Sequence, residues 1–149
     1  MNNKLYNLWK NSKYYSVKHG NYFEIYEELF SNYVGKKITF VEIGVLSGGS
    51  LFMWKEFFGE QARIIGVELN PVAEKWEKHG FEIFIGDQGS STFWEDFFEK
   101  IGNVDVILDD GSHTYQDQIV TLKECIPFIN NSGKMVTEDV HSSYQKQFG

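Results

Sequence analysis

Residues 104–113 read V-D-V-I-L-D-D-G-S-H, an apolar run that ends in two carboxylates, a glycine turn and an imidazole. A second apolar run, K-M-V-T-E-D at residues 134–139, also ends in a pair of acids. In a parallel sheet both strands would end at the same edge, where open α/β folds bind ligands. Carboxylates that meet there repel one another unless a cation lies among them, so the pattern indicates a hard divalent metal. Alternatively, the acids only begin turns and cap helices.

Apolar runs alternate with amphipathic segments in the rest of the chain, which is typical of βαβ units and a parallel sheet. We predict one α/β domain over residues 1–149, with a helical lead-in at 1–35 and a Rossmann-like core at 36–149. Its three layers would enclose a mainly parallel, five-stranded sheet. We expect strands at 38–43, 63–68, 81–85, 104–108 and 134–137, and helices at 23–33, 50–58, 72–78, 92–101 and 115–129.

The composition limits the classes of function. The net charge of −7 disfavours a nucleic-acid partner, which would need a basic surface. No apolar run approaches the roughly 20 residues of a membrane span, and the first residues lack the apolar stretch of a signal peptide. The single cysteine, Cys125, cannot form an internal disulfide, which fits a reducing compartment. We therefore expect a cytoplasmic protein that binds a small molecule and contacts no membrane.

A glycine-rich turn follows the first predicted strand, where residues 42–50 read E-I-G-V-L-S-G-G-S. Glycines at such a turn let a ligand approach the backbone and the exposed amides of the next helix. The spacing is not G-x-G-x-x-G, and Glu42 would repel a pyrophosphate but would suit a ligand with an amino group. The alternative is a plain tight turn that needs glycine for its geometry.

Two more strand ends carry side chains that suit an adenosine. Glu68 ends the second strand, where a carboxylate can accept both hydroxyls of a ribose. Asp87 and Gln88 follow the third strand, where they can bind the edge of a purine. Each of these residues alone could belong to an ordinary turn. Together with the glycine turn, they predict a site for S-adenosylmethionine.

These motifs, taken in order, resemble a known family. F-V-E-I-G-V at residues 40–45, G-G-S-L at 48–51, G-D-Q at 86–88, D-D-G-S-H at 109–113 and E-D at 138–139 are similar to those of metal-dependent class I methyltransferases. The family modifies sugar hydroxyls in macrolide, tetracycline-type and surface-polysaccharide pathways, and cephalosporin-hydroxylase-like proteins are its relatives. The likeness covers nearly the whole chain, including K-H-G at residues 18–20 and Tyr26.

The resemblance implies an O-methyltransferase that uses S-adenosylmethionine and Mg²⁺ to modify a sugar or polyol hydroxyl. It implies His113 as the general base and residues such as His19 and Tyr26 near the entrance. Neighbours in a regular strand point to opposite faces, so Glu138 and Asp139 can bind one ion only if the strand has already ended there. The resemblance implies that the ion is held by Asp110, Glu138 and Asp139, and with the motifs above it places the cofactor at Glu42, Gly44, Gly48, Ser50, Glu68, Asp87, Gln88 and Asp109.

The chain also departs from the family pattern. Full class I methyltransferases have two further strands after the fifth, so we expect a chain truncated at its C-terminus that protects its exposed sheet edge through self-association. One alternative is a shortened, inactive domain that binds the cofactor or assembles with a partner. Another is an iron-dependent, hydroxylase-like enzyme, in which His113, His141 and Asp110 would form a two-histidine, one-carboxylate site.

Overall fold

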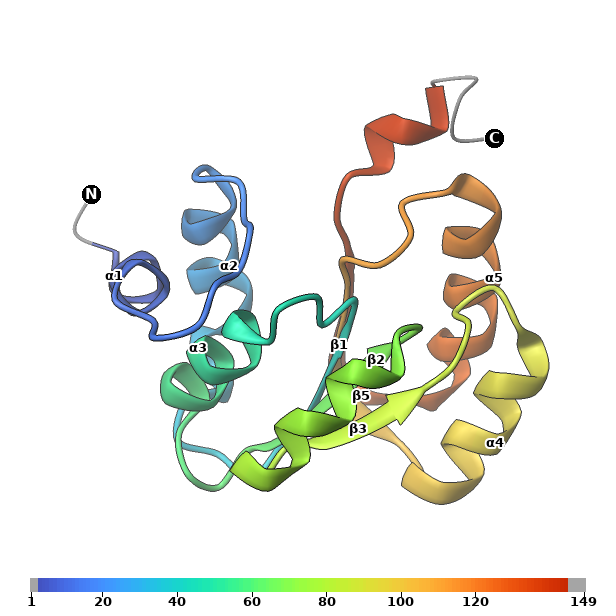
Figure 1. Ribbon diagram of the computed structural model, residues 1–149, viewed down its shortest axis with the longest axis horizontal. Coiled ribbons are helices and arrows are strands. Elements are labelled where there is room, and N and C mark those ends of the chain that lie inside the picture. Colours follow the sequence, from blue (N-terminus) through green and yellow to red (C-terminus); the bar gives the residue numbers. More distant parts are fainter. Residues whose placement is uncertain (1–2, 145–149) are drawn as a thin grey trace.

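The computed structural model describes residues 3–144, which form a parallel sheet with the strand order β3-β2-β1-β4-β5 (Figure 1). The chain builds outward from β1 in one direction, then returns to the other side of β1. This reversal between β1 and β4 is the switch point at which open α/β sheets leave a crevice. The strands are β1 (Thr39–Ile43), β2 (Arg63–Glu68), β3 (Glu82–Ile85), β4 (Val104–Asp109) and β5 (Ile129–Thr137).

Helices cover both faces of the sheet, with α1 to α3 on one side and α4 and α5 on the other (Figure 1). None of the helices within residues 3–144 has both the length and the apolar character that crossing a membrane requires. The helices are α1 (Lys4–Lys10), α2 (Tyr22–Phe30), α3 (Gly49–Phe58), α4 (Ser91–Ile101) and α5 (Tyr115–Cys125), with short 3₁₀ helices η1 (Ser31–Tyr33), η2 (Pro71–His79), η3 (Ile126–Phe128) and η4 (Val140–Tyr144).

Alternation along the strands produces two separate apolar cores. In β1, Phe40 faces α1 to α3 and packs in the same cluster as Trp54, whereas Val41 faces the opposite layer with Trp94 and Phe97. Successive side chains of a strand point to opposite faces, so a sheet that is apolar on both faces needs helices on both. The predicted three-layer architecture is therefore confirmed.

The predicted strands all form, and the main differences lie near β5. The predicted helix at 115–129 ends at Cys125 because Pro127 lacks the N–H that a continuing α-helix needs. β5 begins at Ile129 rather than at residue 134, and its register against β4 shifts between the pairs Val104–Ile129 and Val106–Lys134. The outer edge of β5 pairs with no other strand of residues 3–144, and self-association through it stays a prediction.

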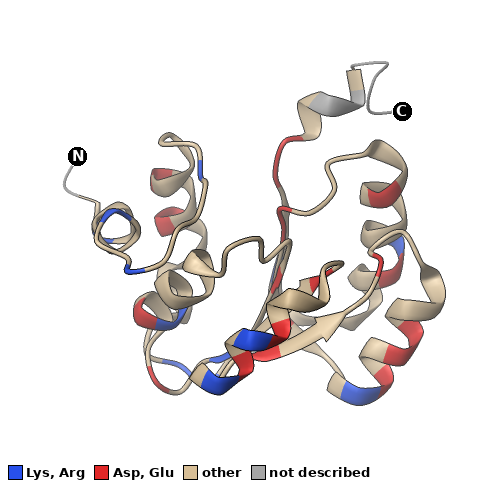
Figure 2. Ribbon diagram, viewed as in Figure 1, with Lys and Arg blue, Asp and Glu red and all other residues tan. Residues whose placement is uncertain are grey.

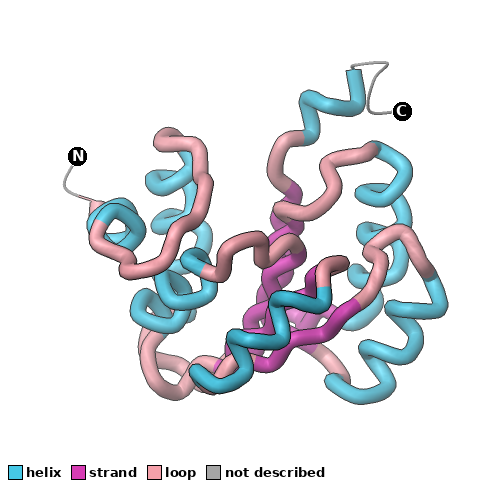
Figure 3. The backbone as a smooth tube through the Cα atoms, in the orientation of Figure 1, coloured by secondary structure: helices cyan, strands magenta, loops and turns pink. Residues whose placement is uncertain are grey.

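The strand register brings the predicted site residues to one edge of the sheet. Asp109 of β4 pairs with Ile43 of β1 on one side and with Thr137 of β5 on the other. The ladder continues into the turns, because the amide of Glu138 donates to the carbonyl of Asp109 at 2.8 Å. The loops that leave the strands gather between the two helical layers (Figure 3).

Candidate active site

A cavity of about 550 Å³ lies at the carboxyl edge of the sheet. Its volume is within the range of sites for small molecules and cofactors. One half is bounded by the glycine turn after β1 and by the ends of β2 and β3, including Glu68 and Asp87. The other half is bounded by the ends of β4 and β5, including Asp110, His113 and Asp139. The predicted cofactor and metal regions therefore adjoin one another.

Gly44 allows the turns after β1 and β4 to pack against each other. Its φ is +89°, and a Cβ at this position would collide with the backbone carbonyl of Asp110. The amide of Asp110 in turn donates to the carbonyl of Ile43 at 3.0 Å. Glycine is thus required here both by conformation and by space, and it couples the cofactor half of the cavity to the acidic half.

Glu68 fixes the glycine turn through its carboxylate. Its Oε2 accepts hydrogen bonds from the amides of Val45 and Leu46 at 2.9 and 3.0 Å. Its Oε1 accepts from the amides of Leu69 and Asn70 at 2.9 and 3.1 Å. Glu68 lines the cavity as predicted, and its carboxylate holds both flanking turns in place.

Gln88 has a structural role that the sequence did not indicate. Its Nε2 donates to Oδ1 of Asp109 at 3.1 Å and to the hydroxyl of Thr121 at 3.0 Å. Its Oε1 accepts from the amide of Ser112 at 2.7 Å. Gln88 lines the cavity beside Asp87, yet its amide already ties the β3 end to the turn after β4. Binding of a purine edge by these two residues stays a prediction.

Glu42 has a different partner from the one expected. It is completely buried, on the same face of β1 as Phe40, and accepts hydrogen bonds from the Ser50 hydroxyl at 2.7 Å and the Trp54 indole at 3.2 Å. The amino group beside it belongs to Lys18, at 3.4 Å. Burial raises the pKa of Glu42, against the attraction of Lys18.

The predicted cofactor residues thus divide into two groups. Contact of any of them with a cofactor stays a prediction. The residues that line the cavity are Gly44, Ser50, Glu68, Asp87 and Gln88, whereas Glu42, Gly48 and Asp109 lie outside its lining.

Three side chains converge in the acidic half. Nε2 of His113 lies 3.6 Å from Oδ1 of Asp110 and 3.6 Å from Oδ2 of Asp139. One donor atom of each residue lies within 4.8 Å of the other two, so together they could hold a metal ion. Asp139 can join the group because β5 ends at Thr137 and Asp139 adopts a positive φ of 53°. Both acids can bind one ion only if the strand ends before them, and β5 does end at Thr137.

Glu138 lies beside this group but faces the N-terminal segment. Its Oε1 accepts hydrogen bonds from Nζ of Lys18 at 3.0 Å and from the hydroxyl of Tyr26. Burial raises the pKa of Glu138 to about 7 against the attraction of Lys18, and the neighbouring charge of Asp110 adds to the rise. The same burial raises the pKa of the Tyr26 phenol, so it donates to Glu138 as a neutral group.

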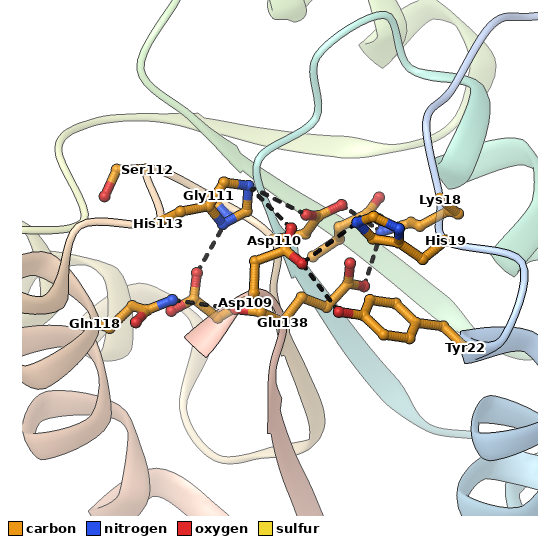
Figure 4. A network of polar contacts seen from close by, with 12 residues as sticks. Lys18, His19, Tyr22, Asp109, Asp110, Gly111, Ser112, His113, Gln118 and Glu138 are labelled. Atoms are coloured by element: carbon orange, nitrogen blue, oxygen red, sulfur yellow. Dashed lines mark hydrogen bonds and ion pairs between the residues drawn. The ribbon is translucent and has the colours of Figure 1, made fainter. Parts of the chain in front are cut away.

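Lys18 and Tyr22 contact the acids of the site, although no role there was predicted for them, unlike His19 and Tyr26 in the same segment. Lys18 lies 2.5 Å from Oδ2 of Asp110, and the hydroxyl of Tyr22 donates to Oδ1 of Asp139 at 2.9 Å. Figure 4 shows that Lys18, His19 and Tyr22 point toward the acids that follow β4 and β5. Tyr22 and Tyr26 lie four residues apart on α2, so this spacing could have identified Tyr22 beside Tyr26, which the resemblance already placed near the entrance.

The charges around Lys18 decide its protonation. Burial alone would lower the pKa of this lysine, but attraction to Glu42, Glu138 and Asp110 outweighs burial and raises the pKa above its ordinary range. Lys18 is therefore a permanent cation inside the acidic cluster. Figure 2 shows Lys and Arg positions on helices and loops, and acidic positions both on the helices and at the strand ends beside this cluster.

Backbone strain is also concentrated around the cavity. Among the described residues, three that are not glycine have a positive φ: Leu46 at 48°, His113 at 59° and Asp139 at 53°. All three line the cavity. Such conformations cost roughly 1–3 kcal/mol each and are typical of functional sites. The backbone conformations of these turns therefore follow from the geometry of the cavity rather than from the local preferences of their residues.

The donor set fits a hard dication better than the iron site considered as an alternative. Carboxylate oxygens are the ligands that Mg²⁺ prefers. His141 does not join the group in this structure, since its Nδ1 lies 3.9 Å from Oδ1 of Asp139 and its side chain is 67% exposed. The two-histidine arrangement is thus not assembled within residues 3–144.

Comparison with known proteins relates this site to sugar-modifying enzymes. The chain is 29% identical over 147 residues to 8-demethyl-8-alpha-L-rhamnosyl tetracenomycin-C 2'-O-methyltransferase of Streptomyces olivaceus, covering 89% of this chain and 38% of that protein. It is 30% identical over 152 residues to Mycinamicin VI 2''-O-methyltransferase of Micromonospora griseorubida, covering 93% of this chain and 37% of that protein. The chain therefore spans less than two-fifths of the length of either relative.

The fold has a solved counterpart. MycE methyltransferase from the mycinamycin biosynthetic pathway, in complex with Mg and SAH, superposes with a TM-score of 0.84 at 27% sequence identity. The match covers 99% of this chain and 41% of that chain. The model of the methyltransferase domain family matches residues 41–140, from β1 to the turn after β5. The chain belongs to this methyltransferase domain family.

Proposed function

We propose that this chain is the catalytic domain of an S-adenosylmethionine-dependent O-methyltransferase that acts on a sugar or polyol hydroxyl with the help of Mg²⁺. The observation that carries the proposal is the shared cavity, in which Glu68 and Asp87 line one half and Asp110, His113 and Asp139 the other. A methyl donor bound in the first half would present its methyl group to a hydroxyl held in the second. The named activities of the relatives, which are O-methylations of sugars on antibiotics, support the same reading.

The cofactor half suits an adenosine that carries an amino-acid tail better than one that carries a phosphate. Glu68 lies at the end of β2, where a carboxylate of this fold accepts ribose hydroxyls. The two halves adjoin where Gly44 approaches the Asp110 turn, because a Cβ at Gly44 would meet the Asp110 carbonyl. The S-adenosylhomocysteine named for the MycE complex is the product form of the cofactor that we propose here.

Asp110, Glu138 and Asp139 would hold the ion, as the resemblance implies. When bound, a dication lowers the pKa of a sugar hydroxyl that it contacts and stabilises the alkoxide that forms. The carboxylates of Asp110 and Asp139 already face His113 within 3.6 Å. Glu138 would offer its second oxygen, Oε2, to the ion, while Oε1 keeps its hydrogen bonds from Lys18 and Tyr26.

His113 is the proposed general base. Its Nε2 stands between Asp110 and Asp139, where it can take the proton of an acceptor hydroxyl and hold it as an imidazolium paired with those carboxylates. The acceptor oxygen then forms a bond to the methyl carbon as the bond from that carbon to sulfur breaks, which leaves S-adenosylhomocysteine. Positioning of the two reactants supplies much of the rate.

Isothermal titration calorimetry of the chain with S-adenosylmethionine, with and without Mg²⁺, tests the proposal. We expect saturable cofactor binding at one site. A chain that binds neither ligand would contradict the proposed function and favour an assembly domain. Cofactor binding without methyl transfer to any of a panel of deoxysugar glycosides would favour the inactive, cofactor-binding alternative.

A further inference from the structure

Three side chains from residues 18–26 make four contacts with the three acids proposed as ion ligands. Nζ of Lys18 contacts Oδ2 of Asp110 at 2.5 Å and Oε1 of Glu138 at 3.0 Å. The hydroxyl of Tyr22 donates to Oδ1 of Asp139 at 2.9 Å, and the hydroxyl of Tyr26 donates to Oε1 of Glu138. Each acid therefore has one oxygen bound by this segment.

The second carboxylate oxygens of Asp110 and Asp139 point away from residues 18–26. Oδ1 of Asp110 and Oδ2 of Asp139, which the N-terminal segment does not bind, are the oxygens that face Nε2 of His113, each at 3.6 Å. The division is the same for both residues: one oxygen bound by residues 18–26, the other turned toward the group that could hold an ion. A carboxylate with one oxygen fixed cannot rotate its second oxygen away without breaking that bond.

Burial strengthens the contacts that Lys18 and Tyr26 make with the acids. The side chain of Lys18 is 1% exposed and Tyr26 is 2% exposed, so water competes little for their hydrogen bonds. Tyr26 is anchored further by stacking on Phe30 and by an edge contact with Trp54, with ring centroids 5.9 and 5.4 Å apart. Tyr22 and Tyr26 lie one turn apart on α2, so a single rigid helix orients both neighbouring acids.

We propose that Lys18, Tyr22 and Tyr26 are positioning residues that orient Asp110, Glu138 and Asp139 for a divalent cation. This inference rests on the proposed function, because it assigns the ion to the same acids. Groups that orient metal ligands commonly change ion affinity by roughly 10- to 100-fold when they are lost. The N-terminal segment is then a working part of the ion site rather than a lead-in to the fold.

Removal of single hydroxyls from the metal-free chain tests the proposal. We would measure Mn²⁺ binding by calorimetry and by electron paramagnetic resonance for the unaltered chain, Tyr22→Phe and Tyr26→Phe. Tyr33→Phe is the matched control, because its hydroxyl donates to the carbonyl of Ser132, away from the cavity. We expect Mn²⁺ affinity to fall about tenfold in the first two variants and to stay unchanged in the control.

Thermal unfolding without metal separates positioning from a purely structural role. If Tyr22→Phe and Tyr26→Phe lower the melting temperature but bind Mn²⁺ as tightly as the unaltered chain, the proposal is overturned while the proposed function stands. If the unaltered chain binds no Mn²⁺, this proposal and the ion site of the proposed function are both overturned. A selective loss of affinity in the two variants, at a melting temperature similar to that of Tyr33→Phe, supports the proposal.

Discussion

The ammonium group of Lys18 lies 2.5 Å from Oδ2 of Asp110, a residue 92 positions further along the chain. This ion pair joins the N-terminal segment to the end of β4, and the same ammonium also contacts Glu138 beyond β5. The contact is therefore both a long-range tie in the fold and part of the charge balance of the site.

Replacement of Lys18 by Met should destabilise the metal-free chain by about 3–5 kcal/mol, because it leaves the buried carboxylates without their cation. Added Mg²⁺ should stabilise this variant less than the unaltered chain, because Asp110 and Glu138 are no longer oriented and the ion binds more weakly. Urea unfolding, with EDTA and then with Mg²⁺, measures both effects. Arg63→Met is the control, since its pair with Glu82 is about 40% exposed and should contribute at most about 1 kcal/mol.

The stability of the metal-free chain should depend on pH through Glu138. Its pKa is about 7 in the folded chain, raised from the ordinary value of 4.5 mainly by burial. A carboxyl group with a raised pKa binds its proton more tightly when folded, so its contribution is present below pH 4.5 and is lost as the pH rises toward 7. Glu138→Gln cannot titrate and should show a smaller decline between pH 5 and 7, measured by urea unfolding in EDTA. Parallel declines in the two proteins would exclude Glu138 as the source.

Ion binding should follow the opposite trend with pH. A metal ligand must be ionised, so Mn²⁺ must displace the proton of Glu138 at any pH below about 7. We expect affinity to rise with pH up to that value and a proton to be released on binding. Calorimetry in buffers with different enthalpies of ionisation measures the released proton. Binding at pH 6 without proton release would show that Glu138 is not a ligand.

His113→Ala should lower the rate of methyl transfer by about 10²- to 10⁴-fold, because it removes the proposed base. Cofactor binding, measured with S-adenosylhomocysteine, should be unchanged. His113→Asn serves as a second variant, because asparagine tolerates the positive φ of 59° at this position. Loss of Mn²⁺ binding in both variants would identify His113 as a ligand of the ion instead.

Glu68→Ala should weaken cofactor affinity at least about tenfold, which corresponds to about 1.4 kcal/mol. The carboxylate accepts four backbone amides from the turns on either side of the cofactor half, so its loss would release both turns. Glu82→Ala, at the outer strand β3, is the control and should leave affinity unchanged. Equal affinities for Glu68→Ala and the unaltered chain would remove Glu68 from the proposed site.

Gly44→Ala should destabilise the chain more than Gly80→Ala. Both glycines have a positive φ, +89° and +87°, so both variants carry the cost of about 1–2 kcal/mol for a left-handed alanine. At Gly80 the added Cβ meets open space, whereas at Gly44 it meets the backbone of Asp110. The difference between their free energies of unfolding measures the close approach of the two turns, and equal values would show that the turns can separate freely.

Much of the fold could be predicted from periodicity and turn residues. The apolar run at 104–108 and the glycine turn after residue 43 specified β4 and the β1–α3 connection, because these elements are determined by local pattern. The early start of β5 could not be predicted, since residues 130–133 read N-N-S-G and form the irregular stretch between the pairs Val104–Ile129 and Val106–Lys134. Tertiary contact there overrides local preference.

The acidic half of the site was predictable because its residues follow strands that share an edge. Asp110, His113 and Asp139 are close together for that reason. The contacts of Lys18 and Tyr22 were not predictable in the same way, because they join residues 92 and 117 positions apart and leave no local pattern, whereas the resemblance alone placed Tyr26 near the entrance. Glu42 shows the converse: its position beside the glycine turn suggested a ligand, but strand alternation directs it into the α1–α3 layer.

The tie between residue 18 and residue 138 spans 120 positions of sequence. During synthesis the lysine and the tyrosines of α2 leave the ribosome long before the acids they bind. Contacts of such large separation form late, after the intervening sheet has closed the loop between them. Capture of an ion would therefore mark the completion of folding, and a nascent chain interrupted before β5 would lack Glu138 and Asp139, two of the three acids proposed to hold the metal.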